Sequence, residues 1–370
     1  MKDAVRLKSG RGIGQDYPSF LVAEVGNNHQ GSLEVALDMV RAAAASGADA
    51  VKFQKRHTDS LLTLEGRNAP YCGANSFGKT YGEHRNALEL TLEEMAEAKR
   101  LTEDLGLVFF ASAWDSVSLR EMEGLGVELV KFSSADLVCI PLLRQAGAMG
   151  VPVVLSTGMS ALPEIDAAVN ELLKFHDDIV ILHCNSTYPC PEEHIALPVI
   201  EQLRRRYKLP VGYSGHERGL GPSVAAVALG ACLIERHFTL DRNLPGTDHQ
   251  ASLEPSDFGR MADMVREVEK AMLTREKQVF PSEVASAKKL RKSIIFARDL
   301  PAGHVLTEAD LMVKCPGTGV SPVYWDDVVG AVLKSMVRFE ELLSWDHVTP
   351  AVSNRARLMA TGRKTAGQKS

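Results

Sequence analysis

The feature that most constrains the fold is an alternation, repeated eight times, of a short apolar segment with a longer amphipathic one. The apolar segments predict buried strands, at residues 19–27, 50–54, 107–114, 128–136, 151–159, 178–186, 209–216 and 231–238. Strands that are apolar throughout are typical of a parallel sheet covered by helices. Eight such units in about 250 residues favour an α/β fold of the closed (β/α)8 TIM-barrel type. An open dinucleotide-binding sheet is disfavoured, because the turn after the first strand lacks the usual glycine pattern.

Three segments depart from this rhythm. Residues 55–90 follow the second strand without clear periodicity, and so long a loop at this end of a barrel predicts a lid or a substrate clamp. A loop that forms an interface, or one that is partly mobile, would explain the same segment. Residues 276–292 are polar and predict a linker between a barrel domain at 1–275 and a small domain of short strands at 293–350. Residues 351–370 carry five basic residues and no acidic ones, and predict a disordered tail.

Composition excludes several classes of function. Lysine and arginine number 42 and aspartate and glutamate 47, so a net charge of −5 offers no basic field for nucleic acid or for an anionic membrane. The chain starts without the apolar run of a signal peptide, and no apolar stretch is long enough to span a membrane. Six cysteines without a CxxC pair favour a reducing compartment, and we therefore expect a cytoplasmic protein.

Polar residues close each predicted strand, where the active sites of such barrels lie. They are Glu24, Asn27, Lys52, Gln54, Ser112, Lys131, Ser133, Ser134, Asp136, Ser156, Thr157, His183, Asn185, Ser186, Tyr188, Ser214, His216, Glu235 and His237. Lysines beside serine hydroxyls indicate a site for a phosphate or a carboxylate. A Schiff-base lysine is a sharper alternative, since burial lowers the pKa of a lysine, and a structural ion pair is the plainer one.

Two of these residues are histidines at the ends of neighbouring strands, His216 and His237. With oxygen ligands they would suit Mn²⁺, Mg²⁺ or Zn²⁺, although a single histidine at a strand end is more often a structural residue. Glu24 and Glu235 are candidate bases. Asp248 follows the last strand on a turn, where either a substrate contact or turn chemistry would explain it.

Eight motifs in chain order give the sequence a family resemblance. They are AEVGNNHQGS, VKFQ, KFSSAD, LSTGM, LHCNSTYPCP, GYSGHE, ERHFT and PGTDHQASLEP, followed in the small domain by ARDLPAGHVLTEADL and VKCPGTG. From about residue 18 to residue 350 the chain resembles the sialic acid synthase (N-acetylneuraminate synthase) family. That resemblance implies a barrel followed by a C-terminal antifreeze-like SAF domain with a β-clip fold.

The resemblance also implies an activity, the metal-dependent condensation of phosphoenolpyruvate with an open-chain amino sugar such as N-acetylmannosamine, with release of phosphate. It assigns phosphoenolpyruvate binding to Lys52, Ser112, Lys131, Ser134, Ser156, Ser186 and Ser214. It assigns sugar binding to Gln54, Asp136, Tyr188 and Asp248. His216 and His237 would hold Mn²⁺ or Mg²⁺. Glu24 would orient or deprotonate the attacking water, with Glu235 a second candidate.

The family pattern includes a domain-swapped homodimer, in which the SAF domain of one chain covers the barrel mouth of the other. An arginine of that domain reaches the N-acetyl group in bacterial members, and here the matching position is Cys315. Asp136 stands where those enzymes show glutamate, and Ser186 where they usually show asparagine. A thiol lacks the guanidinium fork, so either another residue such as Arg298 replaces it or the sugar differs.

Two other functions stay open on the sequence alone. The first is condensation of phosphoenolpyruvate with an aldose phosphate, for which Arg56, Arg67 and Arg85 could form a second phosphate site. The second is a non-catalytic carbohydrate-binding scaffold, which would be expected to lose its strand-end residues. The intact set of glutamates, lysines and histidines argues against the scaffold.

Overall fold

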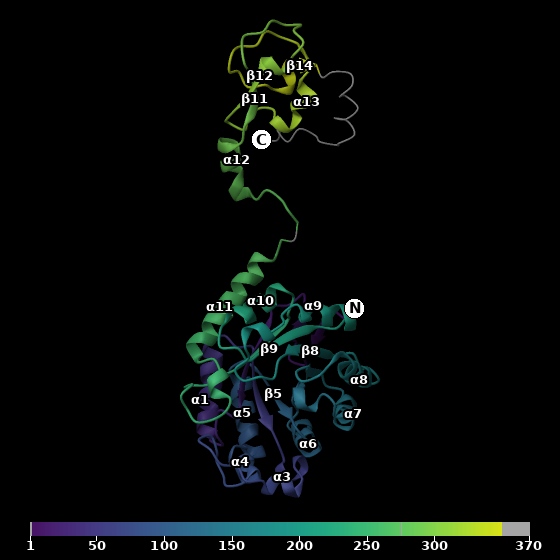
Figure 1. The fold of residues 1–370 in the computed structure, drawn as a ribbon, viewed down its shortest axis with the longest axis vertical. Coiled ribbons are helices and arrows are strands. Elements are labelled where there is room, and N and C mark those ends of the chain that lie inside the picture. The colour runs from purple at the N-terminus through teal and green to yellow at the C-terminus, as the bar shows by residue number, and fades with distance from the viewer. Residues whose placement is uncertain (1, 275, 350–370) are drawn as a thin grey trace. The chain divides into compact units, whose positions relative to one another are not determined.

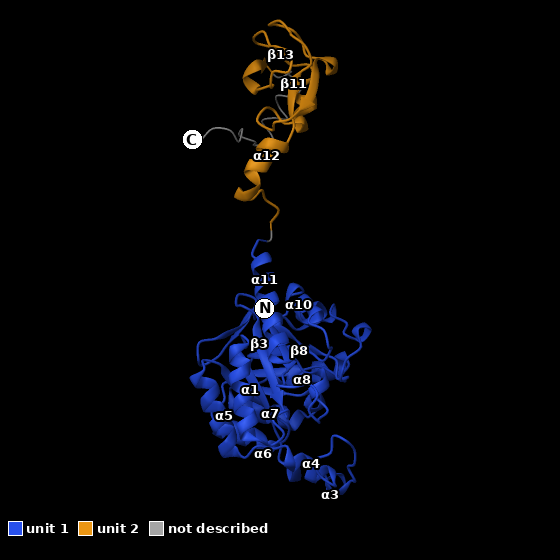
Figure 2. Cartoon of the chain, turned by 90° about the vertical axis from the view of Figure 1, so that its left-hand side faces the viewer, with its two compact units in different colours: residues 1–274 blue, residues 275–370 orange. Residues whose placement is uncertain are grey.

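The computed structural model describes residues 2–274 and 276–349. The chain divides into two compact units, residues 1–274 and residues 275–370, which are described separately below (Figure 2). The tail predicted at 351–370 lies outside the described residues. Among the described residues, no helix combines the length and the apolar composition that crossing a membrane requires.

Within residues 2–274, eight parallel strands close into a barrel, which confirms the predicted fold (Figure 1). They are β3 (Phe20–Gly26), β4 (Ala50–Lys55), β5 (Val108–Ala113), β6 (Val130–Phe132), β7 (Val153–Ser156), β8 (Ile179–Cys184), β9 (Val211–Gly215) and β10 (Leu233–His237). Each strand pairs with the next along the chain, and β10 pairs with β3 to close the ring. The strands are shorter than several of the apolar runs that predicted them, because the polar ends of those runs turn out of the ladder.

The helices between the strands cover the outside of the barrel. They are α1 (Leu33–Ala45), α5 (Leu92–Asp104), α6 (Ser116–Gly124), α7 (Ile140–Met149), α8 (Leu162–Leu172), α9 (Val199–Tyr207), α10 (Gly221–Ala228) and α11 (Pro255–Ala271). Helix α1 begins after a capping serine, with the Ser32 hydroxyl accepting a hydrogen bond from the amide of Val35. The apolar faces of these helices pack against the outward residues of the strands, such as Val51 and Phe53.

Strand geometry decides which residues face the barrel interior. Successive side chains alternate between the two faces of a strand. On β3, Leu21 and Ala23 therefore pack outwards with the helices, while Phe20 and Val22 join a second, inner apolar cluster. Continuing the same alternation brings Glu24 into the interior at the carboxyl end of the strand. Every barrel strand repeats this arrangement, with apolar residues low in the barrel and a polar or small residue at its upper end.

A short hairpin of β1 (Ala4–Arg6) and β2 (Gly12–Gly14) precedes the barrel and was not predicted from the sequence. Its apolar residues Val5, Leu7 and Ile13 belong to the inner apolar cluster, together with the first inward residues of the barrel strands. The hairpin therefore closes the amino-terminal end of the barrel. Its strands are too short, and too rich in glycine, to show a periodic pattern.

The aperiodic segment 55–90 folds into three short helices, α2 (Thr58–Leu61), α3 (Leu64–Asn68) and α4 (Tyr81–Ala87). None is long enough to produce a recognisable amphipathic stripe. Thr80 and Glu83 form a capping box that starts α4. The segment is tied to the turn after β10 by a hydrogen bond of 2.9 Å from the Gly246 amide to Asn75 Oδ1.

The second unit is built from short strands and turns around its own apolar core. Its elements are α12 (Val284–Leu290), β11 (Ser293–Phe296), β12 (Leu311–Lys314), α13 (Trp325–Val328), β13 (Val332–Leu333) and β14 (Val348–Thr349). The 3-10 helices of the two units are η1 (Ser134–Asp136), η2 (Glu192–His194), η3 (His249–Ala251), η4 (Pro281–Glu283), η5 (Glu308–Asp310), η6 (Pro322–Tyr324) and η7 (Trp345–His347). Ile294, Phe296 and Leu306 lie in the core of the second unit. The segment predicted as a linker contains helix α12.

Candidate active site

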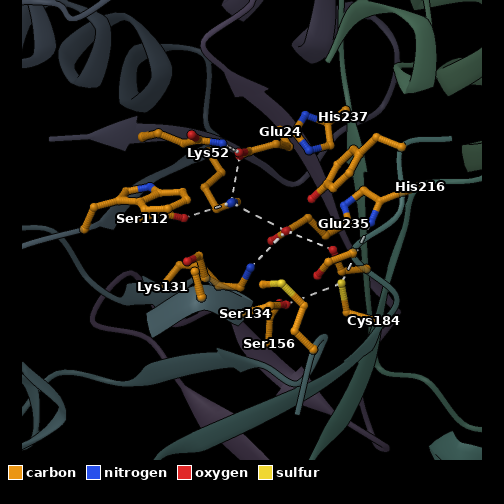
Figure 3. A pocket seen from close by; sticks show the side chains of 18 residues that line it. Glu24, Lys52, Ser112, Lys131, Ser134, Ser156, Cys184, His216, Glu235 and His237 are labelled. Carbon is orange, nitrogen blue, oxygen red and sulfur yellow. Dashed lines mark hydrogen bonds and ion pairs between the residues drawn. The ribbon is translucent and has the colours of Figure 1, made fainter. Parts of the chain in front are cut away.

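The carboxyl ends of the barrel strands surround a cavity of about 240 Å³, which we call the inner cavity (Figure 3). The residues predicted from the sequence that line it are Glu24, Lys52, Gln54, Ser112, Lys131, Ser133, Ser134, Ser156, Ser186, Tyr188, Ser214, His216, Glu235 and His237. Most are the last inward residues of their strands. The strand alternation therefore gathers in one place side chains that lie more than two hundred residues apart in the chain.

Four charged side chains of alternating sign form the floor of the inner cavity. Glu24 Oε2 lies 2.9 Å from Lys52 Nζ, and Glu235 Oε1 lies 3.5 Å from Lys52 Nζ and 3.0 Å from Lys131 Nζ. Lys52 also donates a hydrogen bond of 3.0 Å to Ser112 Oγ. All four charged side chains are between 1% and 6% exposed. Charges so deeply buried persist only when they compensate one another, and these do.

The two carboxylates of this cluster differ in acidity. Burial raises the pKa of Glu24, although Lys52 opposes the shift. Burial would also raise the pKa of Glu235, but Lys131 and Lys52 outweigh it and lower that pKa to about 2. Glu235 is therefore the more acidic of the two carboxylates, and Glu24 is the more basic. Pairs of carboxylates that are pushed apart in this way commonly divide structural and acid–base roles.

The two lysines are also unequal. Burial would lower the pKa of Lys52, but Glu235 and Glu24 outweigh it and the pKa is raised. Burial lowers the pKa of Lys131, and the charge of Lys52 adds to that effect. Both amines are within ion-pair distance of a carboxylate. These pairs favour ammonium groups that bind anions over a free amine that forms a Schiff base.

Serine hydroxyls line one side of the inner cavity. Ser156 Oγ is buried and has no hydrogen-bond partner among the described residues, so it is available to a ligand. Ser134 Oγ accepts a hydrogen bond of 3.0 Å from the Gly158 amide. A Cβ atom at Gly158 would lie 2.3 Å from Ser186 Oγ and 2.7 Å from Ser134 Oγ, so only glycine allows this close approach.

Glu24 is held in place by its neighbours on the same rim. Gln54 Nε2 donates a hydrogen bond of 2.7 Å to Glu24 Oε1. The strand pairing of β3 shifts register between Glu24 and Gly26, where the chain takes a positive φ of 55°. A side chain at Gly26 would meet Gln54, Glu24 and His237 within 3.6 Å. This glycine therefore lets β3 bend while three functional side chains crowd around it.

His216 and His237 face each other with ring centroids 5.4 Å apart. His216 Nδ1 lies 2.6 Å from the Asn185 carbonyl oxygen, and donation to that oxygen leaves Nε2 as the nitrogen with a lone pair. His237 Nδ1 is buried without a hydrogen-bond partner among the described residues, and lies 4.0 Å from Asp248 Oδ2. Burial lowers the pKa of His237 to about 4, so its ring is neutral near pH 7.

This donor set fits a divalent metal ion whose remaining ligands are oxygen atoms. The unpartnered nitrogen of His237 is the observation that favours such an ion. Among residues 2–274 and 276–349, no three His, Cys, Asp or Glu side chains gather as a complete ligand set. Oxygen atoms of substrate and water would therefore have to complete the coordination.

Two of the residues that the resemblance assigns to the sugar, Asp136 and Asp248, lie away from the inner cavity. Asp136 is in η1, accepts a hydrogen bond of 2.6 Å from Ser133 Oγ and lines neither cavity described here. Burial raises its pKa to about 6. Asp248 lies beyond His237 in a second, adjoining space of about 440 Å³, which we call the distal cavity.

The distal cavity is lined by residues of the segment 55–90, of the turn after β10 and of the barrel rim. Its lining comprises Asn27, Asn28, Gln30, Gln54, Arg56, Tyr71, Asn75, Phe77, Tyr81, His84, Arg85, Leu88, Trp114, Tyr188, His237, Pro245, Gly246, Thr247, Asp248 and His249. Gln54, Trp114, Tyr188 and His237 line the inner cavity as well, so the two spaces adjoin.

Sequence reasoning missed four residues of the inner cavity, Trp114, Ala135, Met159 and Cys184. Trp114 follows β5 and buries an indole nitrogen that has no partner among the described residues. Cys184 ends β8 with its sulfur 3.9 Å from His216 Nδ1, and no role was predicted for it. The alternation Val180, Leu182, Cys184 along an inward-facing strand is the signal that could have found it.

The residues that were considered for the N-acetyl contact lie in the second unit. Arg298 donates hydrogen bonds of 2.9 and 2.6 Å to Asp310 Oδ1 from Nε and Nη2. Asp310 is fully buried and also bonds His304 and Thr307. Arg298 thus has a structural partner within its own unit. The Cys315 thiol donates to the Leu290 carbonyl oxygen at 3.3 Å.

Comparison with known proteins identifies the family. The model of the NeuB family matches residues 39–277, and that of the SAF domain matches residues 291–349. N-acetylneuraminate-9-phosphate synthase of Homo sapiens is 39% identical over 311 residues, which cover 84% of this chain and 87% of that protein. N,N'-diacetyllegionaminic acid synthase of Legionella pneumophila is 34% identical over 341 residues, which cover 90% of this chain and 96% of that protein.

A solved structure agrees with these relatives. The N-acetylneuraminic acid synthetase from Leptospira borgpetersenii, in complex with citrate, superimposes with a TM-score of 0.68 at 31% identity. The match covers 77% of this chain and 96% of that one. The family model spans more than half of the chain, the relatives are synthases, and the resemblance seen in the sequence is confirmed. The chain is therefore an enzyme of the NeuB family, a synthase with a C-terminal SAF domain.

Proposed function

We propose that this enzyme condenses phosphoenolpyruvate with an open-chain N-acylated hexosamine to form a nonulosonic acid, a nine-carbon 2-keto-3-deoxy acid, and releases phosphate. Sialic, legionaminic and pseudaminic acids are the product types that its named relatives suggest. The observation that carries the proposal is the buried cluster of Glu24, Lys52, Glu235 and Lys131, set beside two histidines in one cavity.

The inner cavity suits an anion with several oxygen atoms. Lys52 and Lys131 provide two ammonium groups, and Ser156 provides a hydroxyl without a protein partner. Phosphoenolpyruvate carries a phosphate and a carboxylate, so it can take both ammonium groups and several hydroxyls at once. Glu235 lies within ion-pair distance of both lysines and favours their charged form, because Lys131 and Lys52 lower its own pKa.

The reaction forms one carbon–carbon bond and breaks one carbon–oxygen bond. C3 of phosphoenolpyruvate attacks the aldehyde carbon of the sugar, and the aldehyde oxygen takes up a proton to become a hydroxyl. Water adds to C2, and the bond from C2 to the phosphate oxygen then breaks, with its electron pair leaving on phosphate while the new C2 hydroxyl loses its proton and becomes the keto group. Glu24 is the group placed to take the proton of that water, since burial raises its pKa and Gln54 fixes its orientation.

We propose that His216 and His237 hold a divalent metal ion, Mn²⁺ or Mg²⁺. Such an ion would supply Lewis acidity at the aldehyde oxygen of the sugar. Tyr188 packs against His216, with ring centroids 4.0 Å apart and the ring planes tilted by 37°, and so restricts the orientation of that imidazole. The tyrosine also lines both cavities, which fits the sugar contact that the family resemblance implies for it.

We also propose that the enzyme works as a domain-swapped homodimer in the cytoplasm. The second unit exposes large apolar side chains, among them Val323, Met336 and Phe339, at 71%, 65% and 55%. Exposed apolar side chains of this size are typical of a surface that binds another protein chain. The cysteines at the described positions are free thiols, as expected in a reducing compartment. Size-exclusion chromatography with light scattering tests the dimer by measuring the mass of the protein in solution. A monomeric mass at micromolar concentration would refute the proposal.

One assay tests the reaction. The purified protein is incubated with phosphoenolpyruvate, Mn²⁺ and a panel of N-acylated hexosamines and aldose phosphates, and phosphoenolpyruvate consumption and phosphate release are measured. We expect equal amounts of both with at least one hexosamine. No consumption with any sugar would favour the non-catalytic scaffold, and activity with aldose phosphates alone would favour the second enzymatic alternative. Chelator-treated protein should regain activity on adding Mn²⁺, whereas His237→Ala should not.

A further inference from the structure

One ion pair of the barrel domain is completely buried and lies outside both cavities. Arg236 Nη1 is 3.0 Å from Glu217 Oε1, and the two side chains are 0% and 1% exposed. Neither residue lines the inner or the distal cavity. An ion pair so deeply buried gives little net stability, because the cost of removing both charges from water offsets much of their attraction. Its place in the chain indicates a different role.

The two charged residues are direct neighbours of residues in the inner cavity. Glu217 follows His216, and Arg236 stands between Glu235 and His237. Because side chains alternate along a strand, Arg236 points out of the barrel at the level where its two neighbours point into the inner cavity (Figure 3). The ion pair therefore joins the end of β10 to the residue after His216, on the side of the strands that faces away from the cavity.

Several hydrogen bonds fix this ion pair. The Tyr213 hydroxyl donates to Glu217 Oε2 at 2.7 Å, and the Ser223 hydroxyl donates to Glu217 Oε1 at 3.1 Å. Arg236 Nη1 donates to Ser223 Oγ at 2.9 Å and to the Gly219 carbonyl oxygen at 3.0 Å. Its Nη2 donates to the Glu217 carbonyl oxygen. Tyr213 belongs to β9 and Ser223 to α10, so the network connects two strand ends with the helix between them.

The backbone of β9 leaves room for the carboxylate. A Cβ atom at Gly215 would lie 2.6 and 2.9 Å from the two carboxylate oxygen atoms of Glu217, and 2.7 Å from the Tyr213 ring. Glycine at this position therefore lets the carboxylate lie against the strand. Gly215 is also the partner of Arg236 in the pairing of β9 with β10. Strand pairing and the ion pair thus hold the same two strand ends together.

The distance between the two histidine rings depends mainly on the backbone. His216 Nδ1 lies 2.6 Å from the Asn185 carbonyl oxygen, whereas His237 Nδ1 is buried without a partner among the described residues. The separation of 5.4 Å between the ring centroids is therefore set by how the ends of β9 and β10 are placed. A metal ion needs its ligands at bond distances of about 2 Å, so a small shift of either strand end would change its affinity.

We propose that the buried pair of Glu217 and Arg236 positions His216 and His237 relative to each other and thereby sets the affinity of the site for a divalent metal ion. The inference rests on the proposed function, which places the ion at these histidines. Glu217 and Arg236 are positioning residues, because they act through the strand ends that they join. Weakening the pair should therefore change metal binding more than it changes the reaction of the metal-loaded enzyme.

The test measures the Kd of the full chain for Mn²⁺ without substrates, from the electron paramagnetic resonance signal of free Mn²⁺ added to chelator-treated protein. Glu217→Gln keeps the shape of the side chain but removes its charge, and we expect the Kd to rise by about tenfold. Tyr213→Phe removes one hydrogen bond to the carboxylate and retains the ion pair, so we expect a rise of about two- to threefold. This second variant tests the proposal even if Glu217→Gln does not fold.

Asp49→Asn is the matched control. Asp49 pairs with Arg11 at 2.8 Å and with Arg266 at 2.9 Å, and it directly precedes β4 at the amino-terminal end of the barrel. This variant should lower the free energy of unfolding, measured in urea, without changing the Kd for Mn²⁺. Activity gives a second distinction, because saturating Mn²⁺ should return the kcat of Glu217→Gln nearly to the wild-type value.

Three outcomes would contradict the proposal. A wild-type Kd in both Glu217→Gln and Tyr213→Phe would overturn the positioning role and leave the proposed metal site intact. An equal rise in Asp49→Asn, or a kcat that stays low at saturating Mn²⁺, would overturn that role as well, because the effect would then be a general loss of stability. If the wild type binds no Mn²⁺, or if His237→Ala binds it with unchanged Kd, the metal site of the proposed function is itself refuted, and the positioning role with it.

Discussion

The inner and distal cavities adjoin each other but are constructed in different ways. The inner cavity takes most of its side chains from the upper ends of barrel strands, and its buried charges compensate one another within 3.5 Å. The distal cavity takes most of its side chains from the segment 55–90 and the turn after β10, and its arginines outnumber its carboxylates. A site on strands has a fixed geometry, whereas loops can change without disturbing the barrel. We therefore expect the reaction chemistry to depend on the inner cavity and the choice of sugar to depend on the distal cavity.

If this contrast holds, damage to the inner cavity should impair both folding and reaction. Lys52→Met leaves Glu24 without its closest cation and removes one ammonium group from the anion site. We expect kcat/KM for phosphoenolpyruvate to fall by about a thousandfold and the free energy of unfolding by about 3–5 kcal/mol, measured by steady-state kinetics and urea unfolding. Lys99→Met removes a lysine from an ion pair on the surface of α5 and should change neither. Wild-type stability in Lys52→Met would show that the buried pair is dispensable to the fold.

The next largest effect concerns the proton of the attacking water. Glu24→Gln keeps the shape of the side chain but cannot accept a proton, so kcat should fall by about 10²–10⁴-fold. In the wild type, activity should decline as the pH falls through the pKa of Glu24, because the protonated acid is no longer a base. Burial raises that pKa, so the decline should begin above the usual carboxylate range. If Glu24→Gln retains the same acidic limb in its pH–rate profile, another group carries the proton.

A smaller effect is expected from the backbone that supports the serine hydroxyls. Gly158→Ala forces a Cβ atom against Ser186 and Ser134, and we expect KM for phosphoenolpyruvate to rise about tenfold with a smaller effect on KM for the sugar. Gly124→Ala, in α6, places its Cβ where no atom lies within 4 Å and serves as the control. An unchanged KM in Gly158→Ala would mean that these hydroxyls do not bind phosphoenolpyruvate.

The smallest effect should separate the two cavities most cleanly. Tyr81→Phe removes the hydroxyl that orients Arg85 but retains the ring beneath it. KM for the sugar should rise about two- to fivefold while KM for phosphoenolpyruvate stays constant. Tyr207→Phe, which loses a hydrogen bond to Asp166 outside both cavities, should alter neither constant. A parallel rise in both constants for Tyr81→Phe would show that the cavities are energetically coupled.

Much of the inner cavity could be predicted because it follows from strand alternation. Once residues 50–54 are placed on a strand, Lys52 and Gln54 face the same side, and the same rule applies to Ser112 and Glu235. Trp114 and Cys184 were missed because their apolar character is equally typical of a core. The β1–β2 hairpin and helices α2 to α4 were missed because they are too short to show a period.

The sequence by itself determined the barrel, its family and the residues at the strand ends, because alternation and periodicity are local properties that survive in a linear chain. Only the tertiary structure decided how the charges are paired. Lys131 Nζ donates a hydrogen bond of 3.0 Å to Glu235 Oε1, although the two residues are 104 positions apart in the chain. No local sequence pattern encodes this ion pair. The same holds for Arg56 and Arg85 in the distal cavity and for Arg67, which pairs with Asp59 instead. Buried electrostatics depends on which charges come together in space, and that depends on the whole fold.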